Sequence, residues 1–378
     1  METTTSIFEQ ANYWFPYSED KLFLRNVVKV FEFAAHPSVQ IQFYIAIVGL
    51  VVTFLHLIIL TRKSIMTTSV ISIMIGVGIC DFIAMIATII YTWIIYNEDD
   101  ENPCIPPTPL NQLYIYWVFI NVRELVRRSS TWLGVVLALV RYINLKFWTK
   151  TKFQHYALPL YGFVASLRCF LGSVPFSIIY YFRYNIIFHG EWNPSGSCIG
   201  FSKDNSSKIY SFVQVPSELF TDWNGAFGKV YMFVNGVVSK ILPCILLPLL
   251  TFLLINEIKK ADKVRITGSF MKRKKGEKTT NLVIFMTFTF FIVEFPLGLV
   301  VVLQVAFTEL GYLYIATSVG HICNMIFTMN AITHCLICFL MSVQYRNTVR
   351  SILGVRKEQN QFITAVSTAQ LVKIWEHK

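Results

Sequence analysis

Four charged side chains lie close together inside an otherwise apolar stretch of this sequence of 378 residues. The stretch covers residues 113–138, and its segment RELVRRSSTW contains Arg123, Glu124, Arg127 and Arg128. A charge at the centre of a membrane-spanning helix costs roughly 2.5–3.5 kcal/mol even on insertion-based scales, and such groups commonly mark sites for ligands or ions. Four of them cannot all face lipid, so we expect them to face the interior of a helix bundle and to meet partners there.

The overall composition is that of a membrane protein with several spans. The chain is 54% hydrophobic and only 15% charged, which is more apolar than a soluble domain requires. Its formal net charge of +11 could indicate nucleic-acid binding. The basic residues, however, cluster in short segments between apolar runs, a distribution that reports membrane orientation. We therefore expect a multi-pass protein of the plasma membrane, surrounded by the lipid bilayer, with no nucleic acid as partner.

Seven runs are long enough to cross a bilayer as helices of about 20 residues. They cover residues 39–60, 69–95, 113–139, 156–182, 231–255, 281–305 and 313–342. The linkers after the first, third and fifth runs and the tail after the seventh are rich in Lys and Arg, whereas NEDDENPC after the second has none. The positive-inside rule then places the N-terminus outside and the tail in the cytoplasm. We predict an all-α membrane protein, a seven-transmembrane helix bundle.

This topology divides the chain into three parts: an extracellular segment at residues 1–38, the seven-span domain at 39–343, and a cytoplasmic amphipathic helix with a tail at 344–378. Within the first part, SEDKLFLRNVVKVFEF could form a short amphipathic helix, although an unspecific extracellular lead-in is the preferred interpretation. In the third part, Tyr345, Val349, Ile352 and Leu353 follow helical spacing and predict a short helix that lies on the bilayer.

Two cysteines and one asparagine agree with this topology. Of eight cysteines, only Cys104 and Cys198 fall in loops assigned to the outside, where they can form a disulfide bond or remain as two free thiols. The other six lie within the apolar runs, where a thiol is usually a small packing residue. Asn205 begins the sequence NSS, an acceptor for N-glycosylation.

Several short motifs follow one another in the order typical of one receptor family. They are GICDF with Asp81, LALVRYINLK with Arg141, KILPCILLP with Pro243, FTFFIVEFPLG with Phe290 and Pro296, and HCLICFLMSVQYR with His334. Each motif is weak alone, but their order and spacing together are strong. The chain resembles rhodopsin-like G protein-coupled receptors over nearly all of residues 39–353. RRSSTWLG, EFPLG and HCLICFLMSVQYR look more closely like the nematode serpentine receptor class W (Srw), chemoreceptors related to FMRFamide-type neuropeptide receptors.

The chain also departs from the rhodopsin-like pattern. Val140 replaces the acid that precedes the conserved arginine, and Glu294 stands where a tryptophan precedes the proline of the sixth span. Residues 334–338 lack the asparagine, proline and tyrosine of the seventh-span motif, Thr53 replaces the first-span asparagine, and Cys104 lies unusually far before the third-span arginine. These departures leave the predicted fold unchanged but alter the side chains on which the family's sodium site and activation contacts depend.

The resemblance implies a ligand pocket on the extracellular half of the third span. Arg123 and Arg141 share one helix face about 27 Å apart, so Arg123 lies near the extracellular edge if Arg141 lies at the cytoplasmic one. The implied pocket contains Arg123, Glu124, Arg127, Lys240, Glu294 and His321, with Arg127 opposite Glu294. The alternative is a structural cluster of ion pairs that holds the helices together. We expect Glu124 and Arg128 to form such a pair at i,i+4, and the lone residues His56, Arg168 and His321 to be satisfied by neighbours.

A second group of residues is implied in activation and G-protein coupling. Asp81 is expected to face the seventh span near Asn330 and His334, or else to be protonated and bonded to a neighbour. The implied group contains Asp81, Arg141, Pro243, Phe290, Pro296, Asn330 and His334.

These observations predict a G protein-coupled receptor for an extracellular ligand, with a heterotrimeric G protein as cytoplasmic partner and no cofactor. We expect a short peptide, although a small molecule is also compatible. Its acidic or carbonyl-rich end would meet Arg123 and Arg127, and its basic end would meet the acidic residues 98–101. A small transporter is the alternative, but it predicts broken helices in repeat-related positions, which the sequence lacks. An enzyme of the membrane predicts a motif such as HExxH, which is also missing.

Overall fold

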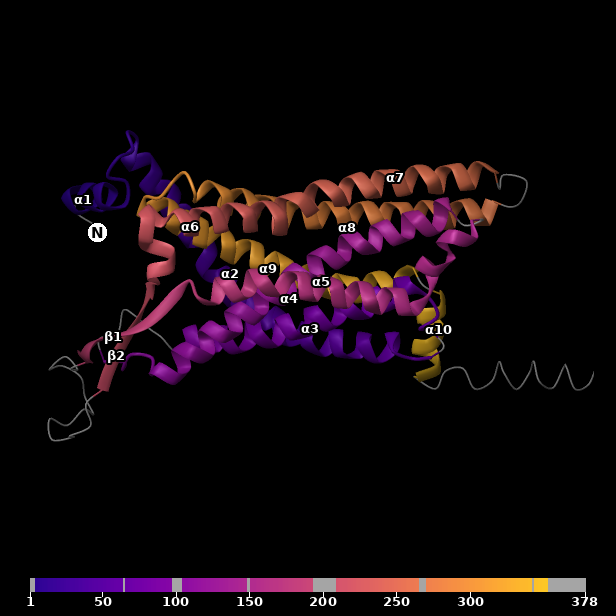
Figure 1. The fold of residues 1–378 in the computed structure, drawn as a ribbon, viewed down its shortest axis with the longest axis horizontal. Coiled ribbons are helices and arrows are strands. Elements are labelled where there is room, and N and C mark those ends of the chain that lie inside the picture. The colour runs from indigo at the N-terminus through magenta and orange to yellow at the C-terminus, as the bar shows by residue number, and fades with distance from the viewer. Residues whose placement is uncertain are drawn as a thin grey trace, which may run out of the picture.

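Seven long helical segments run side by side in the computed structural model of this chain (Figure 1). The structure describes residues 4–63, 65–96, 104–147, 150–192, 209–264, 270–341 and 343–352. The segments are α2 (Lys21–Leu60), α3 (Ser69–Tyr96), α4 (Leu110–Lys146), α5 (Pro159–Tyr181), the successive α6 (Glu218–Gly236), η2 (Val237–Ile241) and α7 (Leu242–Val264), α8 (Phe270–Leu303) and α9 (Leu310–Met341). Helix α6 is kinked at residues 222–225, where the backbone is not helical. Each contains most of one predicted span, so the predicted helix bundle is confirmed.

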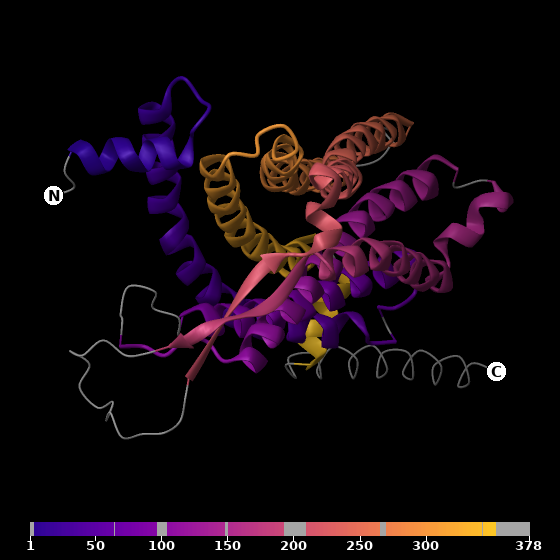
Figure 2. The same cartoon turned by 60° about the vertical axis from the view of Figure 1, so that its left-hand side comes forward.

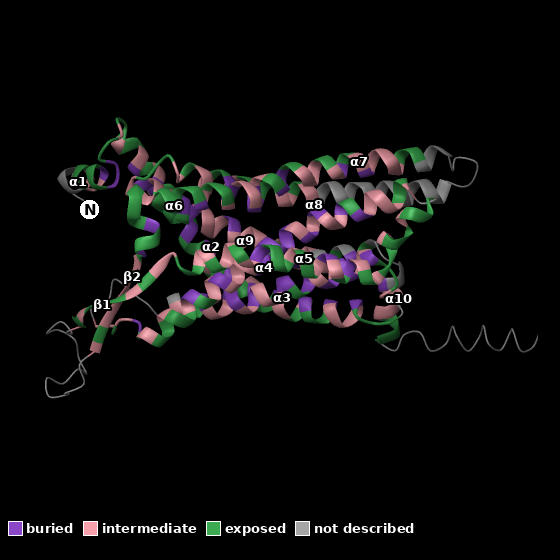
Figure 3. Cartoon of the chain, viewed as in Figure 1, coloured by how far each residue is buried: buried purple, intermediate pink, exposed green. Residues whose placement is uncertain are grey.

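Most of these segments are apolar enough to cross a membrane. Among the described residues, length and composition alone identify Lys21–Leu60, Ser69–Ile94, Pro159–Tyr181, Glu218–Lys260 and Leu310–Leu340. The shorter apolar stretch Thr287–Leu303 belongs to α8. The remaining long helix, α4, contains the charged segment and is therefore less apolar than the others. Many large apolar residues of these helices are exposed, as contact with lipid requires. Figure 3 shows exposed residues along the length of most helices.

Helix α4 packs against three other helices, α3, α5 and α7, and Figure 2 shows the bundle from a second direction. Helix α2 packs against α9 and α3, and α8 packs against α7 and α9. The largest described core cluster joins α3 and α4 through buried apolar residues, namely Ile73, Val77, Cys80, Val126, Leu133 and Val140. The charged segment of α4 is thus surrounded by other helices rather than by lipid.

The fifth span is irregular where it faces the charged segment. Its turn η2 is π-helical, with the Leu242 N–H bonded to the Val237 carbonyl. Pro243 follows, and because proline has no N–H it cannot bond the carbonyl one turn earlier. A π turn accommodates such a break, and here it contains the buried Lys240. Helix α8 approaches closely at Gly298, where an added Cβ would lie only 2.9 Å from the Lys240 Cβ.

The N-terminal segment is folded, so its interpretation as an unspecific lead-in was wrong. It contains α1 (Thr4–Trp14), and α2 already begins at Lys21, well before the predicted start of the span. Phe15 is fully buried and packs with Trp14 and Val28 against the start of α9. The Ser18 hydroxyl donates a 2.6 Å hydrogen bond to Glu309, just before α9. These contacts fasten the segment to the ends of the first and seventh spans.

A β-hairpin between the fourth and fifth spans is an addition that the sequence analysis did not predict. Strands β1 (Tyr184–Trp192) and β2 (Ile209–Pro216) pair antiparallel, with an irregularity between Phe188 and Gly190. The predicted disulfide partner Cys198 and the acceptor Asn205 lie between them, outside the described residues. Cys104 is disulfide-bonded, whereas the six cysteines within the spans are free.

Two short helices complete the described chain. The 3₁₀ helix η1 (Thr151–Ala157) precedes α5, so the fourth span begins at Pro159 rather than at residue 156. Helix α10 (Val343–Ile352) follows α9 and confirms the predicted short helix, although Leu353 lies outside the described residues.

Candidate functional site

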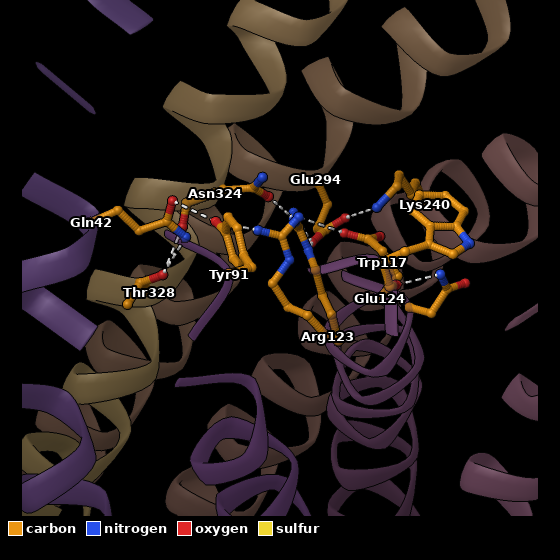
Figure 4. Close-up of polar contacts among 11 residues, drawn as sticks. Gln42, Tyr91, Trp117, Arg123, Glu124, Lys240, Glu294, Asn324 and Thr328 are labelled. Carbon is orange, nitrogen blue, oxygen red and sulfur yellow. Dashed lines mark hydrogen bonds and ion pairs between the residues drawn. The ribbon is translucent and has the colours of Figure 1, made fainter. Parts of the chain in front are cut away.

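The predicted contact between the third and sixth spans is confirmed (Figure 4). Arg127 donates from Nε and Nη2 to Glu294 Oε1 at 3.0 and 2.8 Å. Its Nη1 group donates to the Asn324 side chain of α9. Arg127 and Glu294 are 3% and 1% exposed, so this ion pair is almost completely shielded from solvent. Removal of one partner of an ion pair at such depth leaves a buried charge without its main partner, which is costly.

Lys240 approaches the same carboxylate from the fifth span. Its Nζ lies 3.5 Å from Glu294 Oε2 (Figure 4), whereas Arg127 bonds the other carboxylate oxygen. The prediction that Lys240 points into this space is therefore confirmed. The Glu294 carboxylate of α8 therefore contacts Arg127 of α4 and Lys240 of η2, and these contacts connect the third, fifth and sixth spans.

Arg123 lies one turn farther out and has different partners. Its Nη1 donates a 2.5 Å hydrogen bond to the Tyr91 hydroxyl, and its Nη2 pairs with Glu124 at 3.3 Å. The guanidinium also lies 4.5 Å from the centre of the Tyr91 ring, a distance typical of cation–π contacts. Tyr91 donates in turn to Gln42 Oε1 at 3.3 Å, and Gln42 donates to the Thr328 hydroxyl at 3.2 Å. This network extends the charged cluster to the first, second and seventh spans.

Sequence reasoning missed Gln42, Tyr91 and Asn324 because each is a neutral polar residue in an apolar run. Their only signal in the sequence is a polar side chain within an apolar run. Many such side chains only form hydrogen bonds to their own helix, so the signal is not specific. The structure shows that all three bond to the arginines or to the arginines' partners.

The predicted i,i+4 pair of Glu124 with Arg128 was wrong. Among the described residues, Glu124 forms its ion pair with Arg123 instead. The Arg128 side chain turns toward α5 and the fifth span, where its Nε donates to Ser239 at 2.9 Å and its Nη1 to Ser177 at 3.0 Å. Arg128 also donates to the Ser173 carbonyl and the Asn235 side chain at 3.1 Å each. Four neutral acceptors therefore replace the expected carboxylate.

The positions of His321 and Pro296 do not reveal a role for either residue. His321 is half-buried on α9, and no described hydrogen bond joins it to the cluster. Helix α8 continues through Pro296, two residues after Glu294. These observations leave the implied roles of His321 and Pro296 as predictions.

A cavity of about 130 Å³ lies below the cluster, on the side of α10. Asp81 and Ser130 line one part of it, and Arg141 lines another, with Phe290 and Asn330 on the wall formed by the sixth and seventh spans. Ser130 donates a 3.1 Å hydrogen bond to the buried Asp81. Asp81 and Asn330 line the same cavity, but the described hydrogen bond of the Asp81 carboxylate goes to the third span, so its expected contact with the seventh span stays a prediction.

Other members of the second predicted group are only partly described. Asn330 accepts a 3.2 Å bond from Thr289 of α8. The side chain of His334 lies outside the described residues. Arg141 is half-buried and forms no ion pair with any residue that the structure describes, in agreement with the apolar Val140 beside it.

Helix α10 is fastened to the first span through a buried tyrosine. The Tyr345 hydroxyl lies 2.9 Å from His56 Nδ1, and both side chains are at most 4% exposed. Burial raises the pKa of Tyr345, which keeps its hydroxyl protonated. His56 is thus satisfied by a neighbour, as its sequence context suggested.

Comparisons with known proteins agree with this architecture. Residues 40–356 match the family described as serpentine type 7TM GPCR chemoreceptor Srw. The chain is also similar to the G-protein coupled receptor dmsr-1 of Caenorhabditis elegans, with 22% identity over 401 aligned residues that cover 90% of this chain and 72% of that protein. It is therefore a multi-pass protein of the plasma membrane and a receptor rather than an enzyme. The chain belongs to the Srw family of serpentine seven-transmembrane G protein-coupled chemoreceptors.

Proposed function

We propose that this receptor binds a short extracellular peptide at Arg123 and Glu124 and signals through a heterotrimeric G protein. The observation that carries the proposal is a difference in exposure between two layers of the charged cluster. The side chains of Arg123 and Glu124 are 13% and 23% exposed, whereas those of Arg127 and Glu294 are 3% and 1% exposed. The outer layer can be reached by a ligand, and the inner layer joins the helices.

The chemistry of the outer layer suits a peptide. Arg123 Nε is buried and has no hydrogen-bond partner among the described groups, and neither does the side-chain oxygen of Asn121, two residues farther out. A peptide carbonyl or carboxylate can bond the first, and a peptide N–H can bond the second. Trp117 lies beside Tyr180 and Tyr184, with ring centres 5.3 and 5.2 Å away, and such aromatic groups bind peptide side chains well.

Acidic residues 98–101 remain the proposed site for a basic end of the ligand. They lie outside the described residues. Their field would mainly speed association and is screened beyond about 8 Å at physiological salt. Arg127 is a less suitable ligand contact than Arg123, because Glu294 and Asn324 already accept hydrogen bonds from its guanidinium group. We therefore assign the acidic or carbonyl-rich end of the peptide to Arg123.

A change in the outer layer can reach the sixth span through adjacent side chains. Glu124 and Arg123 lie one turn from Arg127, and Arg127 holds Glu294 of α8. A ligand that draws Glu124 or Arg123 outward changes the charge balance around Arg127 and so alters its hold on α8. The proposed two-state element is thus the position of α8 relative to α4.

The cytoplasmic half of the bundle offers a place for the G protein. The Thr251 and Thr287 hydroxyls form a 2.8 Å hydrogen bond between α7 and α8, beside the cavity that Arg141 lines. Separation of α8 would break this bond and open the cavity toward the cytoplasm. We place residues 1–38 outside the cell and α10 on the cytoplasmic side. The similarity to a G-protein coupled receptor supports the choice of partner.

A peptide library tested on cells that express the receptor, with G-protein activation as readout, tests the proposal. We expect a short peptide to activate the receptor, and Arg123→Ala to weaken its potency at every salt concentration. Arg62→Ala is the matched control because Arg62 is exposed at the cytoplasmic end of α2. An activating ligand whose potency is the same for Arg123→Ala and for the control, at equal surface expression, would contradict the proposed site.

A further inference from the structure

The buried cluster contains more positive than negative charge. Arg123, Arg127, Arg128 and Lys240 are opposed by the carboxylates of Glu124 and Glu294. Asp81 lines a neighbouring cavity of about 20 Å³ together with Arg123 and Arg127. Even when Asp81 is counted, four cations face three carboxylates. An unbalanced charge in a medium of low dielectric is costly, so an additional anion would be stabilised there.

A small cavity lies where such an anion could bind. It has a volume of about 10 Å³ and lies between α4 and the fifth span. The centre of a water-sized sphere can move within that volume, so the cavity also has room for a chloride ion, whose radius is somewhat larger. Arg127, Arg128 and Lys240 line the cavity together with hydroxyl and amide groups and a single carboxylate, Glu124. All three cations are at most 8% exposed.

The cations around this cavity keep donors that no described acceptor uses. A lysine ammonium has three N–H donors, and the only described contact of Lys240 Nζ is the 3.5 Å approach to Glu294. Arg128 has five donors, of which four serve Ser239, Ser177, the Ser173 carbonyl and Asn235. The remaining N–H of Arg128 Nη2 and two of Lys240 are available to one shared acceptor.

We propose that this cavity is a binding site for a small inorganic anion of halide size, with chloride as its occupant. The anion accepts hydrogen bonds from Lys240 and Arg128 and reduces the positive excess of the cluster. It thereby stabilises the junction of the third, fifth and sixth spans. A ligand carboxylate has the same charge, but the cavity has room for a single small ion rather than for a peptide terminus. The site does not depend on the identity of the receptor's ligand.

Thermal unfolding of the purified full chain, without ligand, tests the site. Chloride is exchanged for gluconate at constant ionic strength, since gluconate is too large for the cavity. We expect the melting temperature to be higher in saturating chloride by roughly 4 °C, and bromide to restore the same increase. Because no ligand is present, the increase cannot come from a ligand carboxylate. Equal melting temperatures in chloride and gluconate would mean that water alone fills the cavity and would overturn the proposal.

A variant and a direct measurement make the assignment specific. Lys240→Met removes one cation at nearly constant length and should abolish the chloride-dependent increase. Lys29→Met removes a cation from an exposed pair and should leave it unchanged. A chloride effect of the same size in both variants would overturn the site. If Lys240→Met does not fold, anomalous X-ray diffraction from crystals of the unaltered receptor grown in bromide tests the site. We expect an anomalous peak between Arg128 and Lys240, and its absence would contradict the proposal.

Discussion

Replacement of Glu294 by glutamine is the change whose cost follows most directly from the contacts of the cluster. The carboxylate accepts two hydrogen bonds from Arg127 and lies 3.5 Å from Lys240. Glu294→Gln therefore leaves two buried cations without their carboxylate. Arg127→Gln leaves Glu294 with Lys240 nearby. Loss of one partner of a buried pair costs about 3–5 kcal/mol, so we expect Glu294→Gln near the upper end and Arg127→Gln near the lower end.

The expected shifts in melting temperature are measurable. At about 2 cal/mol/K of unfolding entropy per residue, 3–5 kcal/mol corresponds to a decrease of roughly 4–7 °C for a chain of this length. The double variant should cost less than the sum of the two single losses, because residues in contact couple by about 0.5–3 kcal/mol. Thermal unfolding in detergent, monitored with a dye that does not react with cysteine thiols, gives the melting temperatures of the two single variants and of the double variant.

The exposed pair of Lys29 and Glu32 provides a matched control. Its atoms lie 3.2 Å apart, but the side chains are 42% and 59% exposed. Glu32→Gln should cost about 0–1 kcal/mol because solvent screens the interaction. Strictly additive losses for Arg127→Gln and Glu294→Gln, or a larger loss for Arg127→Gln, would refute the assignment of both cations to one carboxylate.

Three further changes test other contacts. Tyr345→Phe removes the hydroxyl bonded to His56 and should cost about 1–3 kcal/mol, because a buried polar atom loses its partner; a melting temperature equal to that of the unaltered receptor would contradict the bond. Gly298→Ala should lower the melting temperature by a few degrees since its Cβ would meet the neighbouring π turn at 2.9 Å, whereas Gly172→Ala, which meets nothing within 4 Å, should not. Asn205→Gln should abolish the shift in gel mobility that a glycosidase produces, and an unshifted band from surface-expressed unaltered protein would count against the extracellular placement of that loop.

The long helices could be predicted from the sequence because apolar runs of this length have few alternatives. Arg127 opposite Glu294 could also be predicted, since two buried opposite charges on neighbouring spans must find each other and the family resemblance sets their depth. The pair of Glu124 with Arg128 could not. Helical spacing allows it, but the long side chain of Arg128 reaches neutral acceptors on α5 and the fifth span instead.

Features that depend on tertiary packing could not be predicted from the sequence either. Helix α1 and the early start of α2 are stabilised by contacts of Phe15 and Ser18 with the beginning of α9, which no local pattern reveals. The hairpin is rich in aromatic and β-branched residues, which are typical of strands, but the predicted fold class contained no sheet to which they could be assigned. Neutral polar residues such as Tyr91 show their role only once Arg123 is placed beside them.

Nucleotide exchange in a G protein, measured without ligand for the unaltered receptor and for Glu294→Gln at equal amounts, tests the central claim most directly. The claim is that the ion pair between Arg127 and Glu294 keeps α8 packed near α4, and that breaking this ion pair exposes the cytoplasmic cavity. The account predicts that Glu294→Gln raises the ligand-independent exchange rate several-fold, whereas the control Glu32→Gln leaves it unchanged. An unchanged basal rate in a folded Glu294→Gln receptor that still responds to its ligand would contradict it.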